Sequence, residues 1–157
     1  MIDFKPSINF WHDFKSNQTA GMWLFLGSRR SLQIMRPSIV QMVFWGILGG
    51  CANTLFSWLS SGQAGEFNPQ GLVSYALWPF IALIVGIFLS QRVNNPRLML
   101  VPALLWLVLD THIMLFQCLI QYLGDLDILP YVLYDYIPTL FIILFVWQSL
   151  AVVWVIS

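Results

Sequence analysis

The stretch 98-LMLVPALLWLVLDTHIMLFQCLIQY-122 decides the class of fold, because Asp110 is its only Asp, Glu, Lys or Arg. A helix needs about 20 predominantly apolar residues to cross the roughly 30 Å hydrocarbon core of a bilayer. The residues before it, Asn94-Asn95-Pro96, suit a helix start, where the N–H that proline lacks would have no partner. We therefore expect residues 98–122 to form a membrane-spanning helix.

Three further stretches have a comparable length and apolar character. They cover residues of about 39–59, 71–89 and 138–156. The predicted fold is therefore all-α, a polytopic membrane helical bundle with four transmembrane helices in residues 37–157. Residues 1–36 precede it as a cytoplasmic or interfacial amphipathic segment.

The composition excludes several other classes of protein. Hydrophobic residues make up 59% of the chain and charged residues 9%, whereas a soluble domain carries about 25% charged residues. Zero net charge and high hydrophobicity exclude intrinsic disorder. Seven Lys and Arg against seven Asp and Glu give no basic patch for nucleic acid, and two cysteines give no disulfide framework.

The distribution of charge predicts the topology. All seven cations lie either before the first predicted span or between the second and third. In the other two loops, every charged residue is acidic. The cations are Lys5, Lys15, Arg29, Arg30, Arg36, Arg92 and Arg97; the loop acids are Glu66, Asp125, Asp127 and Asp135. Under the positive-inside rule, both termini are then cytoplasmic. We expect a multi-pass protein of the bacterial inner membrane, with the lipid bilayer itself as one partner.

The first 36 residues interleave aromatic residues with charges, a pattern that suits the headgroup zone. One interpretation is one or two short interfacial helices that break near residues 17–21. The alternative is a helix that packs on the cytoplasmic ends of the bundle.

Several polar residues lie inside the predicted spans. A carboxyl group at the depth of Asp110 is costly in lipid, so its side chain should face a partner or water. His112, Gln117, Gln148 and Asn53 complete a candidate intramembrane polar cluster. Such a cluster serves either as a proton, ion or substrate site, or as interhelical hydrogen bonds that hold a small bundle together.

The pair Gly46 and Gly50 forms a GxxxG pattern in the first predicted span. Small residues let helix backbones approach closely, either between two copies or within one chain. We find no catalytic constellation and no residues at metal-ligand spacing, so we expect no enzyme activity, no metal and no cofactor.

The motif LGSRR at residues 26–30, followed by spans and the loop EFNPQGL at 66–72, resembles compact multi-span domains of the Yip type. It is also similar to the N-terminal membrane regions that precede legumain-like peptidase domains in some proteobacteria. The resemblance implies a membrane scaffold or anchor without catalytic residues of its own.

Together these observations favour a non-enzymatic scaffold, anchor or accessory subunit of a larger membrane complex, with a protein partner or a second copy bound. The abrupt apolar ending has two interpretations: the protein stops at the membrane surface, or it continues into a cytoplasmic part. The alternative function is a small oligomeric transporter or channel subunit with a mid-membrane polar site around Asp110.

Overall fold

The computed structural model describes residues 9–60, 69–128, 130 and 136–156, and within these ranges every regular element is helical. The elements are α1 (Phe10–Phe25), α2 (Arg30–Ile34), α3 (Ile39–Ser60), α4 (Pro69–Val93), the 3-10 helix η1 (Pro96–Met99), α5 (Val101–Asp125) and α7 (Ile137–Ile156). The all-helical prediction is confirmed for this part of the chain.

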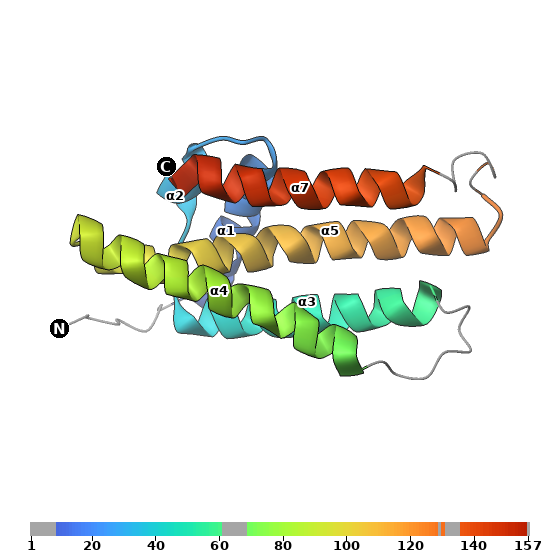
Figure 1. Cartoon of the computed structure of the whole chain (residues 1–157), viewed down its shortest axis with the longest axis horizontal. Coiled ribbons are helices and arrows are strands. Elements are labelled where there is room, and N and C mark those ends of the chain that lie inside the picture. The colour runs from blue at the N-terminus through green and yellow to red at the C-terminus, as the bar shows by residue number, and fades with distance from the viewer. Residues whose placement is uncertain (1–8, 61–68, 129, 131–135, 157) are drawn as a thin grey trace.

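The four long helices lie side by side in a bundle, in which α3 and α5 run in one direction and α4 and α7 in the other (Figure 1). The predicted 39–59 and 138–156 agree with α3 and α7 to within a residue at each end. Helix α5 begins and ends three residues later than the predicted 98–122. The later start arises because Pro96 opens η1 instead, and the first turn of α5 is closed by the bond from Leu104 N–H to Leu100 O (3.0 Å).

Helix α5 is the central helix, since α1, α3, α4 and α7 all pack against it. Every residue from 101 to 111 is buried, so the first half of α5 is enclosed on all sides. The second half of α5 extends past α1, and four of its large side chains are exposed there: Leu115, Phe116, Leu119 and Tyr122. A helix that is apolar on all sides is one that its neighbours surround, and here α1 closes the side that the three long helices leave open.

Helix α1 crosses behind α5 near the end of the bundle where α3 and α5 begin (Figure 1). It is continuous from Phe10 to Phe25, so the predicted break near residues 17–21 is wrong. Both helix-disfavouring residues there face the bundle. Asn17 is fully buried, and a Cβ on Gly21 would lie 2.5 Å from Cγ1 of Val108. These residues allow close packing of α1 on the long helices, as in the second interpretation of this segment.

The described cations gather at one end of the bundle, which also carries Asp13 of α1. Arg29 caps α2 and Arg30 begins it, Arg36 precedes α3, and Arg92 lies in the last turn of α4, all at one end. Asp125 ends α5 at the opposite end. Lys5, Glu66 and Asp135 lie outside the described residues, as do residues 66–68 of the 66–72 loop, whereas residues 69–72 form the start of α4.

Large apolar side chains cover much of the outer surface of the bundle. Exposed examples are Val40, Ile47, Phe80, Ile84, Phe88, Ile142, Val146 and Val153. Two helices, Ile39–Ser60 and Val101–Asp125, are long and apolar enough to cross a membrane, and shorter apolar stretches cover Leu77–Arg92 and Thr139–Val155.

Candidate functional site

Asp110 and Gln148 meet in the middle of the bundle, between α5 and α7. Gln148 Nε2 lies 3.4 Å from Asp110 Oδ1 and 3.4 Å from the carbonyl oxygen of Trp106. Asp110 is 2% exposed and Gln148 is 0% exposed. The structure therefore places together two of the five residues in the predicted polar cluster.

The position of the pair follows from the helices that carry it. Asp110 is the tenth residue of α5, about 14 Å along a helix that rises 1.5 Å per residue. Gln148 lies on the buried stripe of α7, with Ala151, Val152 and Val155 beyond it. Most of the other described side chains of that helix are apolar and exposed, so Gln148 is the polar group that α7 presents to α5.

The pair is only half satisfied. Asp110 Oδ2 and Gln148 Oε1 are both buried and have no hydrogen-bond partner among the described residues. Buried polar atoms are nearly always paired, so two orphaned oxygens in one pair indicate a water, an ion, a proton or strain at that point. This makes the pair the strongest candidate for chemistry inside the bundle.

His112 lies on another side of α5 and does not join Asp110. Two residues along a helix correspond to about 200° of rotation. The His112 ring stacks on Trp45 with centroids 5.6 Å apart, and its Nδ1 is 2.6 Å from the carbonyl oxygen of Val108. Trp45 stacks in turn on Phe14 of α1 (5.1 Å). His112 therefore belongs to the aromatic contact between α1, α3 and α5.

Asn53 and Gln117 lie further along the bundle. Contacts from Thr111 to Trp45 and from Cys118 to Ala52 show that α3 and α5 run in parallel, with a constant offset in residue number. This register places Asn53 level with residue 119, about 14 Å beyond Asp110. Asn53 therefore lies at a different level of the bundle from Asp110, although the predicted polar cluster groups the two. Gln117 is buried, and its Oε1 has no partner within the described part of the chain.

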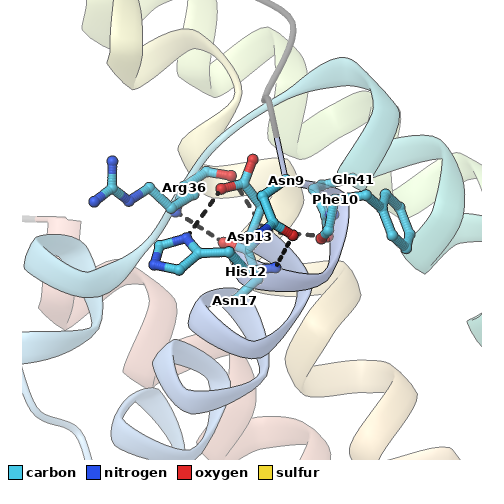
Figure 2. A network of polar contacts seen from close by, with 7 residues as sticks. All are labelled: Asn9, Phe10, His12, Asp13, Asn17, Arg36 and Gln41. Atoms are coloured by element: carbon cyan, nitrogen blue, oxygen red, sulfur yellow. Dashed lines mark hydrogen bonds and ion pairs between the residues drawn. The ribbon is translucent and has the colours of Figure 1, made fainter.

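A second polar cluster ties α1 to the start of α3 (Figure 2). Asn17 Oδ1 accepts from the Arg36 N–H (2.8 Å), and Asn17 Nδ2 donates to the Arg36 carbonyl (3.2 Å) and to Gln41 Oε1 (3.3 Å). Gln41 Nε2 donates to the carbonyl of Phe10 (3.2 Å). We call Asn17, Arg36, Gln41 and Phe10 the α1 latch.

The sequence contains a sign of the latch, although the predicted polar cluster does not include it. Gln41 is a polar residue two positions into an apolar span, and it is 1% exposed. A buried amide needs partners, so it indicates a polar segment packed against the start of that span. The partner, Asn17, lies 24 residues earlier, at a distance that no helical periodicity encodes.

The glycine pair of α3 is split between two environments. A Cβ on Gly46 would meet nothing within 4 Å, whereas Gly50 is buried. Within the described ranges, no other span of this chain therefore packs closely on Gly46. Among the described residues, no three His, Cys, Asp or Glu side chains gather where a metal ion could bind.

Comparison with known proteins gives no match to this chain, whether with protein-family profiles, curated proteins or solved structures.

Proposed function

We propose that this chain is a four-span membrane bundle that serves as a non-enzymatic scaffold, anchor or accessory subunit of a larger complex in a bacterial inner membrane. The observation that carries the proposal is the distribution of polar and apolar side chains. Polar groups such as Gln41, Asp110 and Gln148 are buried, while large apolar side chains are exposed along α3, α4 and α7. A water-soluble protein rarely exposes apolar patches beyond a few hundred Å², whereas lipid solvates them.

The lengths of the helices support four spans. At 1.5 Å per residue, the 25 residues of α4 extend about 37 Å and the 20 residues of α7 about 30 Å, which matches the hydrocarbon thickness. Cations lie at the end where α3 begins and α7 ends. The positive-inside rule then gives a cytoplasmic location for α1, α2 and both chain ends.

A structural role is supported by what the buried polar groups contact. Cys118 Sγ lies 3.4 Å from the carbonyl oxygen of Ala52 and joins α5 to α3, and Thr111 Oγ1, which donates to the Leu107 carbonyl within α5 (2.7 Å), also lies 3.4 Å from the Trp45 carbonyl of α3. Gln148 joins α7 to α5 in the same way. Side chains used in this manner hold helices together and leave the outer surface for lipid and a partner protein.

Topology is tested by labelling single cysteines in a Cys51→Ala, Cys118→Ala background with a membrane-impermeant maleimide. Gln91→Cys and Leu126→Cys place thiols at exposed positions at opposite ends of the bundle. In intact cells we expect labelling of the thiol at 126 and protection of the thiol at 91 until the membrane is opened. Equal labelling of both before opening overturns the four-span proposal.

The scaffold role is tested by purification in mild detergent followed by mass spectrometry of co-migrating proteins. A stoichiometric larger partner is the expected result, and it identifies the complex that the chain serves. A homogeneous homo-oligomer with no other protein bound contradicts the role of accessory subunit.

The alternative, a transporter or channel subunit, is favoured by one observation, the orphaned oxygens of Asp110 and Gln148. A proton or cation that moves through the bundle would use such atoms. Proton and cation flux into vesicles that contain the Asp110→Asn variant distinguishes the two functions. A relay loses its flux in the variant, whereas a scaffold shows none above that of empty vesicles in either form.

A further inference from the structure

A pocket of about 450 Å³ lies between α7 and the turn that joins α1 to α2. Leu26 and Gly27 contribute from the turn, and Trp147, Leu150, Val153 and Trp154 contribute from α7. Its volume lies in the range of small-molecule sites, and its lining is almost entirely apolar. The Asp110–Gln148 pair and the α1 latch lie elsewhere in the bundle.

The turn is held in a fixed conformation. Gly27 has a φ of 65°, and the N–H groups of Gly27 and Ser28 donate to the carbonyls of Leu24 (2.7 Å) and Trp23 (2.9 Å). This pair of bonds is the Schellman motif, which ends a helix with a left-handed residue. Trp147 Nε1 also donates to the carbonyl of Phe25 (2.8 Å), so α7 fixes the same turn from outside. The pocket is therefore preformed.

A cation stands at one end of the pocket. The Arg29 guanidinium carbon lies 5.7 Å from the centroid of the Trp154 ring, which lines the pocket. Arg29 is exposed, and in the described part of the chain the one ion pair joins His12 to Asp13, so no carboxylate neutralises Arg29 there. The charge is available to an anion from outside the chain.

The pocket has its cation at one end and its apolar lining along α7, which is the direction in which a lipid would extend from its headgroup. Trp154 lies near the last turn of α7, and Trp147 is seven residues, or about 10 Å, further into the bundle. The cation is thus near the membrane surface, and the apolar lining continues from it into the hydrocarbon zone. A phosphate followed by an acyl chain has the same order of charge and apolar surface.

We propose that this pocket binds an anionic phospholipid of the cytoplasmic leaflet, with the phosphate at Arg29 and an acyl chain between the Gly27 turn and Trp147. The proposal rests on the membrane embedding given under the proposed function and is independent of the scaffold role. It assigns a role to the LGSRR motif at residues 26–30, which builds both the turn and the cation.

The test uses the full chain in phosphatidylcholine vesicles that contain increasing fractions of brominated phosphatidylglycerol or brominated phosphatidylcholine. Bromine quenches tryptophan fluorescence on contact, and Trp147→Phe and Trp154→Phe identify the quenched rings. We expect saturable quenching at an approximately five-fold lower fraction of the anionic lipid, the preference that one arginine at a membrane surface gives. Arg29→Gln should abolish this preference, and Arg29→Lys should keep it.

Two matched controls separate a built site from general effects. Arg92→Gln removes an exposed cation at the same end of the bundle and should keep the preference. Val153→Phe fills the pocket and should weaken quenching by both lipids, whereas Val146→Phe, at an exposed position of α7 away from the pocket, should not.

The proposal is overturned if both lipids quench the unmodified chain alike, or if Arg92→Gln removes the preference as fully as Arg29→Gln does. Loss of the preference in millimolar inorganic phosphate, at constant ionic strength, would show that free phosphate is the ligand and would overturn it too. Flotation with the vesicles reports membrane embedding separately, so failure of embedding is distinguishable from failure of the site.

Discussion

The two buried polar clusters of this protein differ in how completely their hydrogen bonds are made. In the α1 latch, both polar atoms of the Asn17 side chain have partners, and Gln41 bonds to Asn17 and Phe10. In the Asp110–Gln148 pair, one contact joins the side chains and one oxygen on each residue has no partner among the described residues. The side chains of Asn17, Gln41, Asp110 and Gln148 are all at most 2% exposed, so the burial of these four side chains does not distinguish the clusters.

The difference indicates which cluster contributes more to stability and which has polar atoms left for another partner. A buried polar group contributes little net free energy when it is paired, but leaving it unpaired costs about 1–3 kcal/mol. Breaking the latch would orphan several groups that are now paired. Breaking the Asp110–Gln148 pair would remove one 3.4 Å contact between two side chains that each already have one oxygen without a partner among the described residues. We therefore expect the latch to dominate stability.

The largest effect is expected from Asn17→Leu, which leaves the Arg36 backbone and Gln41 without their partner. Unfolding in detergent, followed by circular dichroism during titration with dodecyl sulfate, should show a loss of about 2–3 kcal/mol. Gln18→Leu is the matched control, because Gln18 is the exposed neighbour on the same helix. Equal losses in both variants would mean that Asn17 contributes through local helix propensity and that the latch contributes little.

The next largest effect is expected at the contact of α1 with α5. Gly21→Ala places a methyl group against Cγ1 of Val108 and should cost about 1–2 kcal/mol in the same unfolding assay. Val108→Ala should relieve part of this cost in the double variant. Gly46→Ala, where the methyl group meets nothing, is the control and should be neutral or slightly stabilising. Destabilisation by Gly46→Ala of the same size would indicate a second helix packed on that face.

The sequence was sufficient to predict the helices because the helix signal is local. Runs of about 20 apolar residues and the prolines before them give α3, α4, α5 and α7 to within a few residues. The packing of α1 was not predictable in this way. Asn17 and Gly21 disfavour an isolated helix, and only contacts with Gln41 and Val108, far away along the chain, make them suitable.

The candidate site was predictable in part for the same reason. Asp110 and Gln148 are polar residues within predicted apolar spans, and a buried polar side chain needs a hydrogen-bond partner. Periodicity also separates His112 from Asp110 by about 200°, which argues against grouping them. The depth of Asn53 depends on the register between α3 and α5. That register is seen in two contacts between residues far apart in the sequence, Thr111 with Trp45 and Cys118 with Ala52.

A smaller effect is expected from Gln148→Leu. The substitution removes the contacts to Asp110 and to the Trp106 carbonyl but also removes an orphaned oxygen. Interhelical hydrogen bonds in membrane proteins contribute about 0.6 kcal/mol on average, and we expect a loss of about that size in the unfolding assay. Ser149→Leu, at the exposed adjacent position on α7, is the control. A loss as large as that of Asn17→Leu would place the pair beside the latch as a structural element.

The smallest effect on stability is expected from Asp110→Asn. An Asn side chain keeps the oxygen that accepts from Gln148 and replaces the orphaned Oδ2 with an amide that can donate to the orphaned Oε1 of Gln148. The free energy of unfolding should therefore stay within about 0.5 kcal/mol of that of the unmodified chain, or rise slightly. A loss above about 2 kcal/mol would show that Oδ2 already has a partner, either a buried water that donates to it or a cation that it binds. An amide nitrogen can neither accept that hydrogen bond nor bind that cation. That outcome would remove the contrast between the two clusters and would make Asp110 the centre of the function.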